Sequence, residues 1–198
     1  LLTGFVAGLL VLTARARAAP ATNRENVAAT VGVLLVLPVF AALPIFTSGA
    51  VASVTDAYFE AVSGLTTTGA TVIAGLDGAD RTVLLWRALL QWLGGIGTVI
   101  LVILHLAHLG VGGMQLYSGA IVHGDQDPLM TRLKETGAPV VAVYAMLTAL
   151  CFIALAMTGL PAFDAIAHAL TAVSTGGFST RDGSVGAFYS VAITNNYQ

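Results

Sequence analysis

Three long apolar runs dominate the pattern of hydrophobic and polar positions along the chain. They cover residues 27–46, 83–106 and 138–157. A bilayer core of roughly 30 Å needs about 20 apolar residues in a helix, so each run predicts one membrane-spanning helix. Pro38 and Pro44 fit inside the first run because neighbouring helices can support a kink. Residues 1–13 are apolar but short and lack a basic start, so we expect the end of a helix there and not a signal peptide.

Two shorter segments, residues 56–72 and 164–180, form an internal repeat. Each starts at an Asp and ends in Thr, Ser and Gly, and a shift of 108 positions aligns them. The identical pairs are Asp56 with Asp164, Ala57 with Ala165, Ala61 with Ala169, Thr67 with Thr175, and Gly69 with Gly177. Each copy follows a full span. The repeated unit is therefore a span, a half-helix with a polar loop, and a second span, and we expect the chain to be a fragment that ends before the last span of its second unit.

The half-helices point to a cavity inside the membrane, because half-helices within a bilayer occur only where they line a cavity or are buried in protein. Asp is a good N-cap residue, so we expect Asp56 and Asp164 to begin the two half-helices. The opposite ends, which face the Thr/Gly loops, carry partial negative charge and favour a cation beside them.

The polar loops, residues 65–71 and 173–179, contain no ionisable side chain. That composition argues against acid/base chemistry or a tight divalent site and suits a monovalent cation. Selectivity filters replace the hydration shell of an ion with backbone carbonyls, and Gly permits the unusual backbone angles that such a loop needs. Plain turns between helices are the alternative. The repetition of the loop after each half-helix favours a filter.

Composition and charge narrow the class of protein. Hydrophobic residues make up 57% of the chain and charged residues 9%, whereas soluble domains carry about 25% charged residues. A soluble enzyme and a disordered tail are therefore excluded. Eight Lys and Arg against ten Asp and Glu exclude a nucleic-acid binder, and one Cys excludes a disulfide framework.

The basic residues predict the orientation of the spans. Segments 14–26 and 107–137 hold Arg15, Arg17, Arg24, Arg132 and Lys134, whereas the opposite side holds Arg81 and Arg181. Because cytoplasmic loops carry an excess of Lys and Arg, these two segments are expected in the cytoplasm.

Several polar or small residues inside apolar segments have more than one interpretation. Arg87 either extends its side chain to the interface or forms an ion pair near the loops with Glu60. His168, at the position equivalent to Glu60, is expected to hydrogen bond within its half-helix. Gly94, Gly95 and Gly97 favour close helix packing, with a hinge or gate as the alternative. His105 and His108 make only a weak case for a metal site.

Four motifs together resemble the TrkH/KtrB family of potassium-uptake proteins, within the K⁺-transporter superfamily that includes the plant HKT proteins. They are SGLTTTGA at residues 63–70, WRALLQWLGGIG at 86–97, GVGGMQ at 110–115 and AVSTGGFST at 172–180. Their order and spacing resemble the TrkH branch more than KtrB. The resemblance implies an all-α integral membrane fold with four membrane–pore–membrane repeats around one pore.

The resemblance also assigns parts of this chain. Residues 1–26 would be the end of an N-terminal helix and a cytoplasmic linker, 27–106 the first repeat, 107–137 a cytoplasmic connection, and 138–198 the incomplete second repeat. The selectivity filter would include Thr67, Thr68, Gly69, Ala70, Thr175, Gly176, Gly177 and Phe178. Gly69 favours K⁺, because relatives that admit Na⁺ often have Ser at this position.

The function implied is K⁺ uptake in a prokaryotic plasma membrane, without a cofactor or a transition metal. The family further implies a homodimer of the full-length chain and a ring of cytosolic nucleotide-binding regulatory subunits. A poorly selective or Na⁺-permeating transporter is one alternative. An intramembrane serine hydrolase that uses Ser63 is the other, but it gives the repeated Thr/Gly loop no role.

Overall fold

The chain forms helices and loops, and the computed structural model describes residues 23–109 and 137–188. Within these ranges there is no β-strand. The elements are α2 (Asn23–Thr47), α3 (Val54–Leu65), the short 3₁₀ helix η1 (Leu76–Gly78), α4 (Arg81–Leu109), α7 (Ala138–Met157) and α8 (Ala162–Val173). The predicted all-α class is confirmed.

Helices α2, α4 and α7 are long and apolar enough to cross a membrane, over Val27–Thr47, Arg81–Val102 and Ala138–Met157. The three predicted apolar helices are therefore confirmed as candidate spans, and the bounds of the third match. The described part of α2 starts at Asn23, before the apolar run. Helix α4 begins where the carboxylate of Asp80 accepts the N–H of Thr82 at 2.7 Å, and this hydrogen bond lowers the pKa of Asp80.

The two half-helices, α3 and α8, have 12 residues each. At 1.5 Å per residue each is about 18 Å long, roughly half a bilayer core. The expected Asp caps are wrong. Helix α3 starts after Ser53, whose hydroxyl accepts the N–H of Asp56, and α8 starts after Pro161 without a side-chain cap. Both Asp residues lie in the first helical turn, where the helix dipole also favours an acid.

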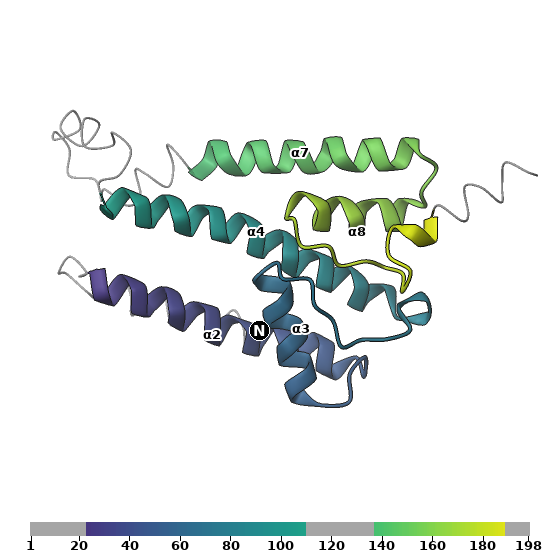
Figure 1. Ribbon diagram of the computed structural model, residues 1–198, viewed down its shortest axis with the longest axis horizontal. Coiled ribbons are helices and arrows are strands. Elements are labelled where there is room, and N and C mark those ends of the chain that lie inside the picture. Colours follow the sequence, from purple (N-terminus) through teal and green to yellow (C-terminus); the bar gives the residue numbers. More distant parts are fainter. Residues whose placement is uncertain (1–22, 110–136, 189–198) are drawn as a thin grey trace, which may run out of the picture.

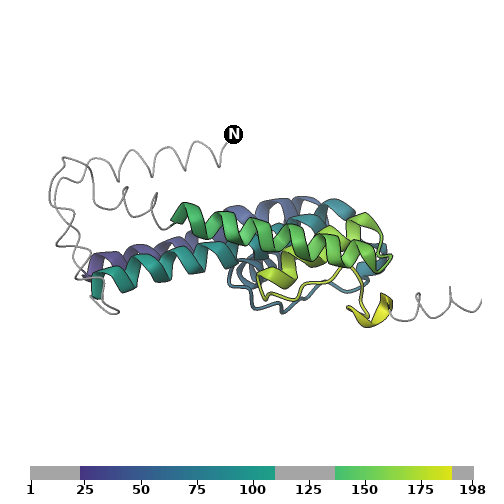
Figure 2. The same cartoon turned by 90° about the horizontal axis from the view of Figure 1, so that it is seen from above.

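The corresponding helices are in contact in both repeats. Helix α2 packs against α3, and α7 packs against α8. Helix α4 contacts α3 and α8, and so joins the two repeats. Figure 1 shows α8 between α7 and α4, whereas α3 crosses steeply beside α2. In the view from above, α7 lies in front of α4 (Figure 2). Of the residues in the apolar stretch of α4, 44% are buried, against 22% in α2 and none in α7. Helix α4 is therefore the central helix of the described fold.

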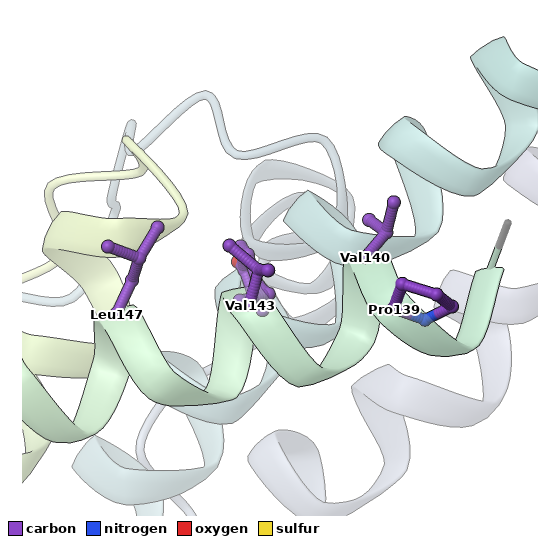
Figure 3. A pocket seen from close by; sticks show the side chains of 5 residues that line it. Pro139, Val140, Val143 and Leu147 are labelled. Atoms are coloured by element: carbon purple, nitrogen blue, oxygen red, sulfur yellow. The ribbon is translucent and has the colours of Figure 1, made fainter.

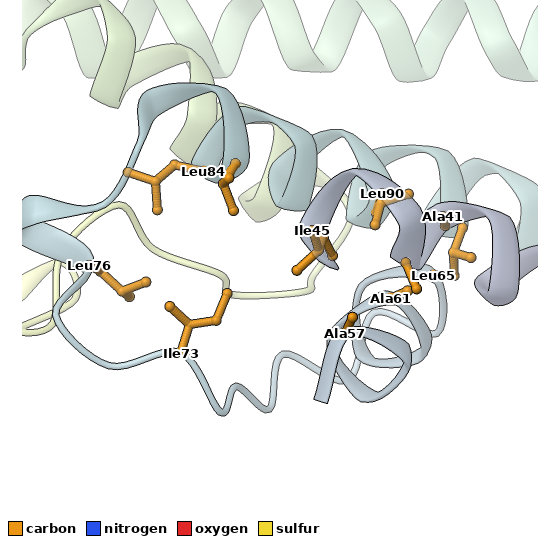
Figure 4. Packing of buried hydrophobic residues seen from close by; sticks show 11 residues of the cluster. Ala41, Ile45, Ala57, Ala61, Leu65, Ile73, Leu76, Leu84 and Leu90 are labelled. Carbon is orange, nitrogen blue, oxygen red and sulfur yellow. The ribbon is translucent and has the colours of Figure 1, made fainter. Parts of the chain in front are cut away.

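The apolar core lies where α2, α3 and α4 meet (Figure 4). Its buried members are Ala41, Ala42, Ile45, Ala57, Ala61, Leu65, Ile73, Leu76, Val83, Leu84 and Leu90. Alanines occupy much of the contact between α2 and α3, and small residues let helix backbones approach closely. This core fixes α3 against α4 and so positions the loop that follows α3.

Glycines on α4 bring the ends of both half-helices close to it. A Cβ on Gly94 would collide with the carbonyl oxygen of Leu65, the last residue of α3. A Cβ on Gly95 would lie 2.6 Å from the Tyr144 hydroxyl and 2.9 Å from Cβ of Ser174. The packing interpretation is confirmed for these two residues. For Gly97, no described residue lies within 4 Å of such a Cβ, so no packing contact in the described part of the chain explains it.

Candidate functional site

The candidate site consists of two loops with the same backbone conformation. The first loop, residues 66–72, follows α3, and the second loop, residues 174–180, follows α8. Thr67 and Thr175 have φ of 55° and 57°, and Gly69 and Gly177 both have φ of 78°. Positive φ is uncommon for threonine, whereas glycine adopts it freely. The internal repeat seen in the sequence is therefore also a repeat of backbone geometry.

Matching hydrogen bonds tie each loop to the end of its half-helix. In the first loop Thr67 N–H donates to Gly64 O at 3.0 Å and Thr68 N–H to Ser63 O at 3.0 Å. In the second loop the equivalent bonds join Thr175 to Ala172 at 3.0 Å and Gly176 to Thr171 at 2.9 Å. A trans peptide directs its carbonyl opposite to its N–H. The carbonyls of Thr67 and Thr175 therefore face away from the half-helices.

The two loops touch each other at glycines. A Cβ on Gly69 would collide with the carbonyl oxygen of Gly176. Any side chain at position 69 would thus push the loops apart or force the second loop to move. The structure brings together all eight predicted filter residues in these two adjacent loops.

Phe178 differs from the other predicted filter residues in its role. Its side chain is 5% exposed, and its ring lies under the guanidinium of Arg87 with 4.1 Å from Cζ to the ring centroid. The backbone N–H of Phe178 donates to Oε1 of Gln91 at 3.0 Å. Phe178 therefore attaches the second loop to α4 through its ring and its backbone N–H.

A buried ion pair holds the first loop from behind. Arg87 Nε lies 3.1 Å from Oε2 of Glu60, and the side chains are 1% and 0% exposed. The other carboxylate oxygen, Oε1, accepts the Thr71 hydroxyl at 2.5 Å and the Val72 N–H at 2.6 Å. Arg87 Nη2 also donates to Oγ1 of Thr71 at 2.9 Å. Of the two interpretations of Arg87, the structure supports the ion pair, which satisfies both charges with hydrogen bonds to the loop.

Arg87 also reaches the second loop, where its Nη1 donates to the carbonyl oxygen of Ser179 at 3.5 Å. His168 occupies the place of Glu60 in this repeat, as predicted. Its Nδ1 lies 2.7 Å from the Asp164 carbonyl oxygen and its Nε2 lies 3.1 Å from the Ser179 hydroxyl. Ser179 is the equivalent of Thr71. In each repeat, one polar side chain of the half-helix thus hydrogen bonds to a hydroxyl side chain near the end of the loop: Glu60 to Thr71, and His168 to Ser179.

Asp164 braces the second loop and does not cap α8. Its Oδ1 accepts the Thr180 hydroxyl at 2.5 Å, and its Oδ2 lies 3.7 Å from Arg181 Nη2. Arg181 also pairs with Asp77 of η1 at 3.2 Å. Asp164, in the first turn of α8, therefore stabilises the loop that follows the other end of this helix.

Ser63, the nucleophile of the hydrolase alternative, donates its hydroxyl to the Ala70 carbonyl oxygen at 2.6 Å. His168, the half-helix histidine, is bound to Asp164 and Ser179. No base is thus paired with Ser63 in the described residues, and the hydrolase alternative has no geometric support. Ser63 instead holds the first loop.

Gln91 is a site residue that the sequence analysis missed, because it lies within the motif at 86–97 without a role of its own. It is fully buried on α4 and binds the second loop through Phe178. Arg87 lies four residues earlier, so both side chains share one face of the helix. Two buried polar residues four apart in an apolar span were the signal that could have revealed this face.

Metal and pocket features lie elsewhere or outside the described residues. Among the side chains that the structure describes, no group of three His, Cys, Asp or Glu could hold a metal. The side chains of His105 and His108, the weak metal candidates, lie outside that part. Several predictions lie outside residues 23–109 and 137–188: the helix end at 1–13, the motif at 110–115, and the basic residues Arg15, Arg17, Arg132 and Lys134.

An apolar hollow lies along α7 and is lined by Pro139, Val140, Val143, Tyr144 and Leu147 (Figure 3). None of these residues belongs to the loops.

Comparisons with known proteins agree on one family. The model of the family TrkH, described as cation transport protein, matches residues 2–195. The Trk system potassium uptake protein TrkH of Escherichia coli K12 is 43% identical over 86% of this chain, and that of Halomonas elongata is 48% identical over 80%. The crystal structure of the potassium transporter TrkH from Vibrio parahaemolyticus matches 89% of this chain with a TM-score of 0.74 and 38% identity. The chain spans about a third of the length of these relatives, covering 36%, 33% and 35% of them.

Proposed function

The chain belongs to the TrkH family of cation transport proteins, and on that premise we propose that it supplies two pore loops of a potassium-uptake protein. Its described part is all-helical with three candidate spans, as expected of a multi-pass membrane protein. The relatives are named as potassium uptake proteins, which supports a transporter over an enzyme. In this proposal the two loops form part of a selectivity filter for K⁺.

The paired conformation of the loops is the observation that carries this proposal. Thr67 and Gly69 have the same positive φ as Thr175 and Gly177, and the loops touch at Gly69 and Gly176. In this proposal, the pair presents equivalent main-chain carbonyls from two repeats to one ion. Carbonyl oxygens that replace the hydration shell are the means by which filters select K⁺.

The loops lie at the C-terminal ends of two half-helices, which carry partial negative charge. Neither loop contains an ionisable side chain, so an ion there meets dipoles and not a fixed charge. Such binding is strong enough to replace water and weak enough to release the ion. The buried pair of Arg87 and Glu60 fixes the first loop from behind with a formal net charge of zero.

Location and partners extend this proposal. We place the protein in a prokaryotic plasma membrane, as a homodimer of the full-length chain that carries a cytosolic nucleotide-binding regulatory subunit. The Trk system names of the relatives support a multi-component transporter. Lipid covers the exposed apolar faces of the spans in this proposal. K⁺ is the transported ion and no cofactor takes part.

Ion uptake into proteoliposomes tests the function on the full-length protein that contains this chain. The wild type should take up K⁺ and Rb⁺ in preference to Na⁺. Gly69→Ser should lose that preference, because its side chain would collide with the Gly176 carbonyl and strain a residue at φ of 78°.

Gly159→Ser is the matched control, because Gly159 has φ of 88° but no neighbour within 4 Å of an added Cβ. It carries similar backbone strain in the turn between α7 and α8, away from the loops. Equal uptake of Na⁺ by the wild type would instead favour the poorly selective alternative. A Gly69→Ser protein that keeps the wild-type preference would contradict the assignment of the first loop to the filter.

A further inference from the structure

Gln91 lies between α4 and the backbones of both loops. Its side chain is fully buried, and its Oε1 accepts the Phe178 N–H at 3.0 Å. A Cβ on Gly176 would collide with the Gln91 amide, and a Cβ on Gly69 would lie 3.7 Å from Gln91 Nε2. One side-chain amide thus contacts the second loop and borders the first at the place where the loops meet.

The hydrogen bond from Phe178 fixes the direction of a main-chain carbonyl. The N–H of Phe178 and the C=O of Gly177 belong to one peptide unit, and the described chain has no cis peptide bond. Because the N–H and C=O of a trans peptide point in opposite directions, the Gly177 carbonyl faces away from Gln91 and α4. Gly176 and Gly177 have no Cβ to restrict rotation of this segment, so the peptide needs an anchor outside the loop.

The other end of the amide is unusual. Gln91 Nε2 is the one buried side-chain nitrogen or oxygen without a hydrogen-bond partner in the part of the chain that the structure describes. Reversal of the amide would leave the Phe178 N–H opposite an NH₂ group, so the acceptor requirement of Phe178 fixes the orientation. Buried polar groups are almost always paired, and an apolar side chain would avoid the unpaired donor. The hydrogen bond that Gln91 Oε1 accepts from the Phe178 N–H therefore accounts for an amide at this position.

We propose that Gln91 is a positioning residue of the ion pathway, which holds the Gly177 carbonyl toward the ion and sets the spacing between the two loops. This inference rests on the proposed function, since the carbonyl matters for selectivity only if the loops form a filter. Gln91 acts through the backbone and does not itself touch the ion. Arg87, one turn earlier on α4, contacts the ring of Phe178 through its guanidinium. Gln91 accepts the backbone N–H of the same residue.

The test compares Gln91→Met and Gln91→Glu in the full-length protein by K⁺, Rb⁺ and Na⁺ uptake. Met has a similar length and no strong acceptor, so the preference for K⁺ over Na⁺ should fall about tenfold, the effect of losing one hydrogen bond. Glu keeps an acceptor at the same reach and, protonated in this buried place, adds no charge, so it should retain most of the preference. Thr148→Val is the matched control, because it removes the hydrogen bond from Trp92 on the same helix, at 3.0 Å, without touching the loops.

Amide hydrogen exchange of a peptide covering residues 174–180 reads the anchor directly. Exchange should be faster in Gln91→Met than in the wild type and unchanged in Thr148→Val. If Gln91→Met does not yield folded protein, Gln91→Asn replaces it with the same expectation, because its amide is one methylene too short to reach Phe178.

Two results separate this proposal from the proposed function. A wild type that takes up no K⁺ would refute the proposed function, and the exchange experiment would still test the anchor. A K⁺-selective wild type with wild-type selectivity and exchange in Gln91→Met would overturn the role of Gln91 alone. Equal loss in Gln91→Met and Gln91→Glu would also overturn it, because the acceptor would then not be the cause.

Discussion

At the scale of single residues, polar side chains inside the membrane segments act mainly on the loop backbones. Glu60 binds Thr71 and Val72, His168 binds Ser179, and Ser63 binds the Ala70 carbonyl. A polar group buried without a partner is costly. These residues avoid that cost by pairing with main-chain and hydroxyl groups that would otherwise be unpaired as well. The ordered loops result from this mutual pairing.

The ion pair of Arg87 and Glu60 gives the first prediction at this scale. Glu60→Gln or Arg87→Gln alone should destabilise the protein by about 3–5 kcal/mol, because each leaves an uncompensated buried charge. Either variant should also lower the K⁺ preference, since the pair holds Thr71. Thermal unfolding in detergent and ion uptake measure the two effects. The double variant should lose less stability than the sum of the single ones. Single variants with wild-type stability, flux and selectivity would contradict this role of the ion pair.

At the scale of elements, both half-helices pack against α4, and only α3 has a side-chain cap. The predicted Asp caps were wrong because Ser53 and Pro161 precede the first turns, and Ser competes equally well for the N-cap position. The contact of α3 and α8 with α4 was not predictable from the repeat alone, because the sequence repeat relates α3 to α8 and contains no information on what lies between them. The glycines of α4 were a correct indication of that contact at Gly94 and Gly95.

These glycines give a prediction about helix packing. Gly94→Ala should destabilise the protein by about 1–3 kcal/mol, the usual cost of overpacking a close contact, because its methyl group would meet the Leu65 carbonyl. Gly97→Ala should be neutral or slightly stabilising, since alanine is the better helix former and nothing lies within 4 Å of its Cβ. Thermal unfolding of the two variants in the same detergent provides the comparison. Equal effects would show that packing at Gly94 is not tight.

At the scale of the whole molecule, contacts beyond α4 join the two repeats. Asp182 Oδ1 accepts the N–H groups of Gly75 and Leu76, both at 3.1 Å, and Arg181 pairs with Asp77. The segment after the second loop is thereby attached to the segment after the first. The two repeats are therefore joined both through α4 and through this link.

The Asp182 link predicts a pH dependence. The N–H of Leu76, as the largest cause, and that of Gly75 lower the pKa of Asp182 from its ordinary value of 3.8. A lowered folded-state pKa contributes stability that is complete above 3.8 and disappears as the pH falls through the lower folded value. Asp182→Ala should therefore reduce thermal stability at pH 7, and the difference from wild type should vanish below that folded value. A difference that persists unchanged into strong acid would contradict the role of the carboxylate.

The sequence by itself determined the three spans, the two half-helices and the repeated loops, because hydropathy and the spacing of identical residues are local properties of the chain. It also indicated Glu60 as a partner of Arg87, since a charge inside a span needs a partner. Only the tertiary structure decided that Gly69 faces Gly176, that Gln91 anchors Phe178 and that Asp164 holds Thr180. These contacts join residues from 16 to 107 positions apart, and their geometry arises only when α4 packs both half-helices against itself.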